Sequence, residues 1–421
     1  MVTDTNSNNF SSTQQSSSLV KSFIARAHQF MKNTEQHALQ GVNPGGIYQA
    51  IWCRDASFIL RSWFHSGNVH EVLQQISTIW SHQIVPGKEK IIYGRGSSEM
   101  DYKPTIAKED KQKAFEGALP TTMYQAGYSE VYGLNPDIDS TALMISTTSW
   151  ILTKILKEKT KQQQSLSSSY KDKDSSSSYN ENNGNYYMLS EAKSMTEHAK
   201  VIDFVVPRML KAVDHLFSRD TDDDGLLEQN HNEDWMDTGL RAGKIVYSQA
   251  CMILALNNLS YLLSELDNYN ESEKMIKLAT KTICAVEQKL WSDNDSCYID
   301  IQQSHHIGGP YRTVTQDVLL YLVAISENTN SDSLGMHQGS SHHNGTIAKE
   351  KQRQNQEEEQ QEKEHRQEHP LKQNNNILYH HQINLDQLFK RANNTLYAIS
   401  NRVWLDGWPT NVETLLKSSG P

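Results

Sequence analysis

Three carboxylates crowd one tryptophan in the segment "NEDWMDTG", where Glu233, Asp234 and Asp237 flank Trp235. Like-charge repulsion and removal from water both favour the neutral form of a carboxyl group, and so raise its pKa toward neutral pH. Such a group can donate a proton as a general acid. The alternative is that Asp237 only caps the helix that follows. Capping accounts for one of the carboxylates at most.

A second group of chemically active side chains lies earlier in the chain, in "YQAIWCRDASF". It combines the aromatic rings of Tyr48 and Trp52 with the adjacent ions Arg54 and Asp55. Sugars present apolar C–H faces and a rim of hydroxyl groups, so a sugar site needs flat aromatic rings and forked hydrogen-bonding groups. The alternative is a structural ion pair at a helix start. We expect Arg54 and Asp55 to pair with each other when the site is empty, and with sugar hydroxyls when it is occupied.

An acidic turn, "DTDDDG", precedes the tryptophan segment. Asp220, Asp222, Asp224 and Gly225 match the first half of a calcium-binding loop, but the twelfth position holds His231 in place of a bidentate glutamate. We therefore interpret the segment as a turn that ends a helix, and leave a metal ion at the turn open. The sequence shows no dinucleotide fingerprint, phosphate loop or paired-histidine motif, so no cofactor and no metal centre are predicted.

Amphipathic helices must position these segments. Apolar residues recur at helical spacing along most of the chain, and convincing strand patterns are rare. Residues 248–263 are apolar on most sides, which places this helix in the interior. The pattern predicts an all-α array of helical hairpins. The other apolar faces span 19–31, 69–84, 144–155, 205–216, 275–290, 314–325 and 385–403.

The net charge and the cysteine content argue against several classes of protein. The net charge of −10 argues against a nucleic-acid or anionic-membrane binder, because both partners require a basic surface. No apolar run is long enough to span a membrane, and residues 1–18 lack the apolar core of a secretory signal. We interpret the cysteines as reduced packing residues of a cytoplasmic protein, because no CxxC spacing joins Cys53, Cys251, Cys284 and Cys297.

Low-complexity sequence interrupts the helical pattern at three places. Residues 1–18 are mostly Ser, Thr, Asn and Gln, and we expect them to form a disordered leader. Residues 157–185 and 328–376 are rich in charged and small polar residues, and we expect them to be insertions in surface loops. The predicted organisation is therefore one helical domain, residues 19–421, that carries two insertions.

The two chemically active stretches together resemble one family. "YQAIWCRDASFIL" is similar to the Tyr, Trp and Arg-Asp signature of the (α/α)6-barrel glycosidases, which include glucoamylases, trehalases, neutral invertases and the glucosidase domain of glycogen debranching enzymes. Within this group, "DWMDTGLRAGKIVYSQA" most resembles the amylo-α-1,6-glucosidase pattern. The resemblance covers roughly residues 46–323 and resumes at "RANNTLYAISNRVWLDGWP". It implies a toroid of helical hairpins that hydrolyses an oligo- or polysaccharide.

The resemblance also implies a role for each matching residue. Asp237 would be the general acid that protonates the glycosidic oxygen, with Asp234 as the second choice. The implied substrate contacts are Tyr48, Arg54, Asp55 and Asp139 around the terminal glucosyl unit, Trp52 and Trp235 as walls against its ring, and Arg241 or Lys244 to orient the acid or the sugar.

The general base has no clear counterpart. Inverting hydrolysis needs a base about 6.5–9.5 Å from the acid, so that a water molecule fits between them. The resembling families carry this base near the C-terminus, where Glu413 is the only candidate with aromatic neighbours. The helices predicted here, about nine or ten, are also fewer than six hairpins require. We therefore expect a toroid that lacks its last hairpin, which a second chain could complete.

The favoured function is release of glucosyl units from glycogen- or starch-like α-glucans by an inverting amylo-α-1,6-glucosidase. One alternative is an exo-glycosidase that acts on another glucoside, as glucoamylases, trehalases or invertases do. A second alternative is a truncated relative that binds sugar without hydrolysing it. A purely structural helical repeat is disfavoured, because no fixed-period repeat is visible.

Overall fold

The computed structural model describes most of the helical region of the chain. Three predicted site residues, Tyr48, Asp237 and Glu413, lie outside the described residues, as does the predicted helix 19–31. Within the described part, no helix combines the length and apolarity needed to cross a lipid bilayer. The described residues are 50–94, 105–124, 127–171, 181–236, 241–302, 315, 317–330, 385–402, 404–405 and 408–409.

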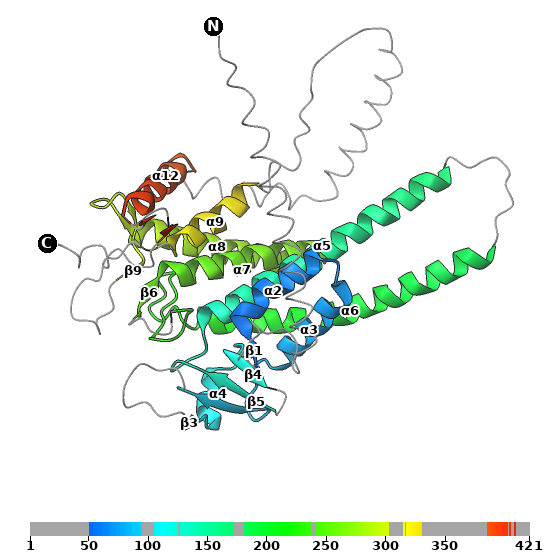
Figure 1. Cartoon of the computed structure of the whole chain (residues 1–421), viewed down its shortest axis with the longest axis horizontal. Helices are drawn as coiled ribbons and strands as arrows, with labels where there is room; N and C mark the ends of the chain where they lie inside the picture. The colour runs from blue at the N-terminus through cyan, green and yellow to red at the C-terminus, as the bar shows by residue number, and fades with distance from the viewer. Residues whose placement is uncertain are drawn as a thin grey trace, which may run out of the picture.

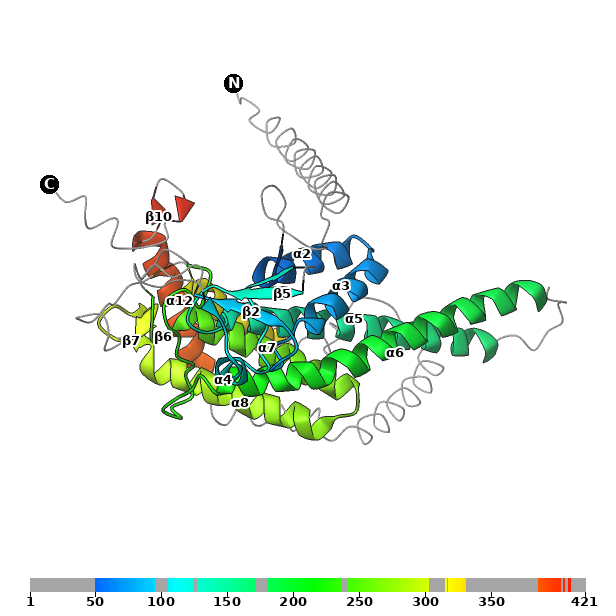
Figure 2. The same cartoon turned by 90° about the horizontal axis from the view of Figure 1, so that it is seen from below.

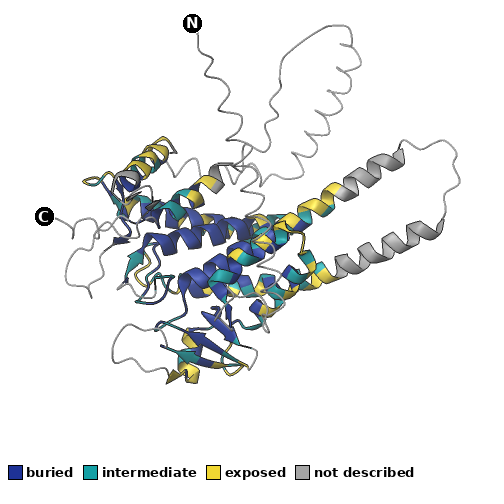
Figure 3. Cartoon of the chain, viewed as in Figure 1, coloured by how far each residue is buried: buried dark blue, intermediate teal, exposed yellow. Residues whose placement is uncertain are grey.

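Four helices pack side by side in an inner layer (Figure 1). They are α2 (Cys53–His65), α5 (Ile138–Lys171), α7 (Val246–Glu265) and α9 (Val318–Asn330). α5 lies between α2 and α7, and α9 packs on the other side of α7. Every residue of α7 from Val246 to Ser260 is buried, so the helix that the sequence places in the interior is the centre of the described structure (Figure 3).

Along the described chain, a second helix follows each inner helix. α3 packs on α2 and α6, α6 packs on α5, and α8 packs on α7, which gives an outer layer (Figure 2). α12 packs instead on the hairpin of β7 (Trp291–Ser292) and β8 (Cys297–Tyr298). This two-layered array of hairpins confirms the predicted all-α class. The second helices are α3 (Val69–Ser81), α6 (Glu181–Phe217), α8 (Tyr269–Lys289) and α12 (Leu385–Arg402).

Helical periodicity located most of these elements because the helices other than α7 bury one stripe of apolar residues. On α3, for example, Val72, Ile76 and Trp80 follow one another at helical spacing, and all three are buried. The indole N–H of Trp80 donates a 2.9 Å hydrogen bond to Thr148 Oγ1 on α5, so the polar atom of this large side chain is satisfied inside the core.

α5 and α6 extend together beyond the body of the molecule (Figure 1). α5 continues to Lys171 and α6 begins at Glu181, so helix occupies part of the segment 157–185 that the sequence predicts as a loop insertion. Lys, Glu and Gln in this segment are good helix formers. They prolong a helix that packing has already nucleated, and propagation costs far less than nucleation.

A five-stranded sheet packs beside the helices, and the helical periodicity gave no sign of it. None of its strands exceeds four residues, which is too short for the alternation of a strand to stand out. β1 leads directly into α2, and the backbone N–H of Cys53 donates a 3.0 Å bond to Thr121 O, so the sheet fixes where α2 begins. The strands lie in the order β1 (Ile51–Trp52), β4 (Thr122–Tyr124), β5 (Tyr128–Val131), β2 (Lys90–Tyr93) and β3 (Thr105–Ile106), beside α4 (Glu109–Ala114).

Two smaller strand pairs complete the described structure. β6 (Lys244–Ile245) pairs with β9 (Ile301–Gln302) and leads directly into α7. β10 (Trp404–Leu405) pairs with β11 (Trp408–Pro409) after α12.

Candidate active site

The N-terminal ends of the four inner helices meet, and several of the predicted site residues that the structure describes lie there. Arg54 at the start of α2 forms a 3.2 Å ion pair with Asp139 in the first turn of α5. Arg241, just before α7, forms a 2.7 Å ion pair with Asp317, which immediately precedes α9. The unpaired N–H groups of a helix start carry partial positive charge, which favours acidic side chains at this end of the array.

Arg54 binds a partner from another helix. Asp139 is fully buried and accepts hydrogen bonds from Arg54 Nη1 and from Tyr247 Oη, each at 3.2 Å. The expectation that Arg54 pairs with Asp55 is therefore wrong. Adjacent residues on a helix point in different directions, so Arg54 reaches across to α5. Burial raises the pKa of the half-buried Asp55, and the charge of Arg54 opposes this only in part.

Asp137 and Asp139 form a pair of buried carboxyl groups at the start of α5. Burial raises the pKa of Asp137 well above its ordinary value, and the neighbouring Asp139 raises it further. The pKa of Asp139 is also raised by burial, against the opposing charge of Arg54. Within the described residues, Oδ1 of each group has no hydrogen-bond partner. Asp137 was not predicted, although it lies two residues before Asp139 in "NPDIDST".

Three carboxylates surround the guanidinium of Arg241, and we call these four residues the Arg241 cluster. Arg241 lies 3.4 Å (Nε) from Asp234 Oδ2, 3.0 Å (Nη2) from Asp300 Oδ1 and 2.7 Å (Nη1) from Asp317 Oδ2. All four side chains are buried, and one cation does not balance three anions. Burial outweighs the attraction of Arg241 and raises the pKa of Asp300 to about 7. The cluster can therefore hold a proton near neutral pH.

The sequence analysis missed two members of this cluster. Asp300 follows the apolar run "CYI", and Asp317 precedes the apolar helix "VLLYLVA". Each is an isolated acid in an apolar context, which is the same signal that drew attention to Arg54 and Asp55. A buried charge requires a partner, and that requirement could have identified both residues as members of a network.

Trp235 contacts the Arg241 cluster, and further hydrogen bonds hold Asp234 within it. The indole Nε1 of the half-buried Trp235 donates a 3.0 Å hydrogen bond to Asp317 Oδ2. Asp234 accepts a 2.9 Å bond from the backbone N–H of Met236 and another 2.9 Å bond from Gln229 Nε2, in addition to its ion pair with Arg241. Hydrogen bonds and ion pairs therefore hold residues on both sides of the predicted acid Asp237, namely Asp234 and Trp235 before it and Arg241 after it.

Glu233 belongs to a separate network, although the sequence groups it with Asp234. Its carboxylate forms a 2.7 Å ion pair with Arg219 at the end of α6. It also accepts bonds from the backbone N–H groups of Asn135, at 3.1 Å, and Asn230, at 2.8 Å. Glu233 thus joins three segments of the chain in a structural role.

Trp52, the other predicted ring wall, lies against a second aromatic residue. Its ring packs edge-on against Tyr132, with ring centroids 5.1 Å apart, and both side chains are half-buried. Tyr132 was not predicted. Whether Trp52 contacts a sugar ring stays a prediction.

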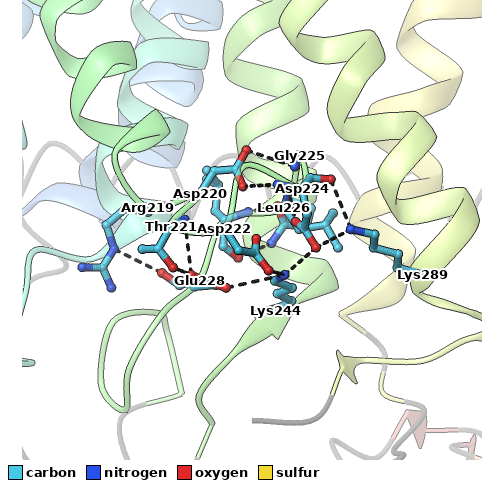
Figure 4. Close-up of polar contacts among 12 residues, drawn as sticks. Arg219, Asp220, Thr221, Asp222, Asp224, Gly225, Leu226, Glu228, Lys244 and Lys289 are labelled. Atoms are coloured by element: carbon cyan, nitrogen blue, oxygen red, sulfur yellow. Dashed lines mark hydrogen bonds and ion pairs between the residues drawn. The ribbon is translucent and has the colours of Figure 1, made fainter. Parts of the chain in front are cut away.

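The side chain of Lys244, on β6, contacts the acidic turn and lies outside the Arg241 cluster (Figure 4). Its ammonium group forms ion pairs with Asp222 at 2.7 Å, with Asp224, and with Glu228 at 3.5 Å. Lys289 of α8 also contacts Asp224. Partial burial favours the neutral form of Asp224, but the hydrogen bonds from the two lysines outweigh it and lower the pKa to about 2.

We call residues 220–228 the Asp-rich turn. The carboxylate of Asp220 accepts hydrogen bonds from the backbone N–H groups of Asp224 and Gly225, at 2.8 and 3.0 Å, so the segment closes the end of α6 as predicted. One oxygen from each of Asp220, Asp222 and Asp224 lies within 4.8 Å of the others. Lysine side chains, including Lys281 at 3.2 Å from Asp220, supply positive charge to these carboxylates.

Solved structures with a similar arrangement have low sequence identity to this chain. A rhamnosidase from Klebsiella oxytoca with rhamnose bound is 12% identical, with a TM-score of 0.37, and the match covers 66% of this chain and 39% of that chain. This chain thus matches less than half the length of the rhamnosidase. The GH63 mannosylglycerate hydrolase from Thermus thermophilus in complex with glucose is 15% identical, with a TM-score of 0.43 and 72% of each chain covered.

An uncharacterized conserved protein, also from Thermus thermophilus, is 14% identical, with a TM-score of 0.42 and 72% of each chain covered. No protein-family model and no curated protein sequence matches the chain.

Proposed function

We propose that this protein is a glycoside hydrolase that releases glucosyl units from glycogen- or starch-like α-glucans, by inversion and at α-1,6 branch points. The observation that carries the proposal is the meeting of five buried aspartates and two arginines, beside Trp235, at the N-terminal ends of the inner helices. Such groups bind sugar hydroxyls, and carboxyls with raised pKa can protonate a leaving group. The resemblance of "WCRD" and "DWMD" to the (α/α)6 glycosidases supports the same function.

Asp237 is the proposed general acid. It lies in the sequence between Trp235 and Arg241, both of which contact Asp317. Asp234 is the weaker candidate, because both of its oxygens already accept hydrogen bonds and it pairs with Arg241. These contacts fit a carboxylate that orients Arg241.

Glu413 is the proposed general base, and hydrolysis by an acid, a base and a water molecule requires no cofactor. Arg54 and Asp55 are proposed to hold hydroxyls of the terminal glucosyl unit, with Asp139 fixing Arg54 from behind.

The test is glucose release from a branched limit dextrin. The Asp237→Asn variant should lose activity by about two to four orders of magnitude while it still binds the dextrin, because the amide cannot donate the acid proton. Asp214→Asn is the matched control, since Asp214 is exposed on the outer helix α6. Unchanged activity of Asp237→Asn would remove the acid assignment.

Other substrates distinguish the alternatives. Isomaltose, maltose, trehalose and sucrose should be tested alongside the dextrin, and preference for isomaltose and the dextrin supports the α-1,6 assignment. Binding of the dextrin with no hydrolysis of any of these sugars would identify a non-catalytic relative. Loss of turnover in Glu413→Gln, with binding retained, would support this residue as the base.

A further inference from the structure

A single oxygen atom of Asp317 joins Trp235 to Arg241. Asp317 Oδ2 accepts a 3.0 Å bond from the indole Nε1 of Trp235 and a 2.7 Å bond from Arg241 Nη1. Trp235 precedes β6 and α7, whereas Asp317 lies 82 residues later at the start of α9. The residue that precedes α9 therefore fixes an aromatic side chain that belongs to a distant loop.

Asp317 is itself held rigidly. Its partner Arg241 is fixed on its other sides by Asp234 and Asp300, and the backbone N–H of Asp317 donates a 3.3 Å bond to Thr315 Oγ1. The side chains of Arg241 and Asp317 are only 4% and 7% exposed. An acceptor that cannot move fixes the direction of the only N–H group that an indole ring possesses.

We propose that Asp317 is a positioning residue that holds the ring of Trp235 in the orientation in which it contacts a sugar ring. This inference rests on the proposed function, in which Trp235 is a wall of the sugar site. A sugar ring gains most from an aromatic face that lies parallel to its C–H groups. A ring that is free to turn must be ordered when the sugar binds, which lowers the affinity.

Charge balance at Arg241 does not by itself explain this arrangement. Asp234 and Asp300 already place two carboxyl groups against one guanidinium. The bond from Trp235 adds nothing to that balance, because an indole is uncharged. The two roles of Asp317, as an anion and as an acceptor for Trp235, can therefore be separated by substitution.

The experiment measures KM and kcat for glucose release from isomaltose, a neutral probe that does not respond directly to the charge of the site. Asp317→Leu removes the acceptor and should raise KM by about tenfold, with a smaller change in kcat. Asp317→Asn keeps an acceptor oxygen and removes only the charge, so KM should stay within about twofold of the wild-type value. Asp214→Asn, on the exposed face of α6, is the control for unchanged activity. Asp300→Asn is a comparison that removes a carboxylate from Arg241 without touching Trp235, and so shows what that loss alone does to KM and kcat.

Trp235→Phe provides a second, independent variant. It keeps an aromatic face, lacks the N–H donor and leaves the pair of Asp317 and Arg241 intact, so it remains informative if Asp317→Leu does not fold. KM should rise in this variant, and Asp317→Leu should add nothing further in the Trp235→Phe background.

The inference is overturned by equal KM values for Asp317→Leu and Asp317→Asn, by additive effects in the double variant, or by a wild-type KM for Trp235→Phe. If the wild-type protein neither binds nor hydrolyses isomaltose or the limit dextrin, the proposed function fails first and this inference fails with it. If the wild-type protein is active and any of the three results above is obtained, this inference is overturned and the proposed function stands.

Discussion

The Arg241 cluster and the Asp-rich turn use the same chemistry with opposite results. Each brings several aspartates together with at least one basic side chain. In the Arg241 cluster burial dominates, and the pKa of Asp300 rises to about 7. In the Asp-rich turn the partly buried Asp224 has two lysine partners, and its pKa falls to about 2. The number of carboxylates therefore does not decide which group can carry a proton near neutral pH.

The pKa values of Asp300 and Asp224 shift in opposite directions because the two regions differ in their ratio of cations to anions and in their exposure to water. One guanidinium serves three carboxylates in the core, whereas Lys244, Lys281 and Lys289 all serve the turn. Water also screens the charges of the turn, whereas the side chains of the Arg241 cluster are less than a tenth exposed. The sequence signal of clustered acids is thus ambiguous until burial is known.

Among the variants that test this comparison, replacement of Arg241 should have the largest effect on stability. Arg241→Met leaves three buried carboxylates without a counter-charge and should lower the free energy of unfolding by about 3–5 kcal/mol. Urea denaturation at pH 7 measures this loss. Arg208→Met is the control, because Arg208 lies over the ring of Phe204 on α6 and forms no ion pair among the described residues. Equal losses in the two variants would contradict a special role for Arg241.

Asp300→Asn should change how stability depends on pH. The folded pKa of about 7 exceeds the unfolded value of about 3.9, so the native state binds the extra proton between these values. The contribution of Asp300 therefore stabilises the wild type at low pH and is lost as pH rises from about 4 to about 7. Each tenfold difference in proton affinity corresponds to about 1.4 kcal/mol.

In Asp300→Asn this decrease of stability with rising pH should disappear. Denaturation midpoints between pH 4 and pH 8 measure the change. The groups that face Asp300 are Arg241, Asp234, Asp317 and Thr315. Parallel stability profiles for the variant and the wild type would show that the cluster does not hold the proton at Asp300.

Asp224→Asn should show the opposite sign with a smaller effect. The folded pKa of about 2 lies below the unfolded value of about 3.9, so the contribution of Asp224 is present above pH 4 and is lost as pH falls toward 2. The variant should be modestly less stable than the wild type at pH 7 and equal to it near pH 2. The difference should shrink in 1 M salt, where the Debye length is about 3 Å. A loss that persists in salt would place the turn in the same class as the Arg241 cluster.

Lys281→Met should have the smallest effect. Lys281 is 40% exposed, and its partner Asp223 is 93% exposed. Surface pairs of this kind contribute little, so the melting temperature should change by less than about 2 °C. Calorimetry in low salt checks this value, and a larger change would mean that the turn depends on each of its lysines.

Most of the fold could be predicted from the sequence because burial of one helical stripe leaves a periodic signal. The stripe of α3 is an example, whereas α7, which is buried from Val246 to Ser260, was recognised because it is apolar on most sides. The five-stranded sheet could not be predicted, since pairs such as β1 and β4 depend on contacts between residues that are far apart in the sequence. The end of α5 was also missed, because low complexity does not by itself distinguish a loop from a solvated helix.

The site was predictable where residue types cluster locally, and not where the fold brings single residues together. Arg54, Asp139, Trp235 and Arg241 were identified from short motifs and do lie at the ends of the inner helices. Asp317 approaches Trp235 only because α9 packs beside α7. Lys244 shows the converse, since a position near the motif did not place it in the Arg241 cluster.

The placement of the repetitive tracts has a genetic consequence. The connections at 172–180 and 331–384 both follow the C-terminal ends of inner helices, opposite the end where the charged site lies. With 34 residues at about 1.5 Å each, α5 alone separates the first connection from Asp139 by roughly 50 Å. Alleles that differ only in tract length should therefore encode proteins with the same chemistry, and selection would have little to act on there.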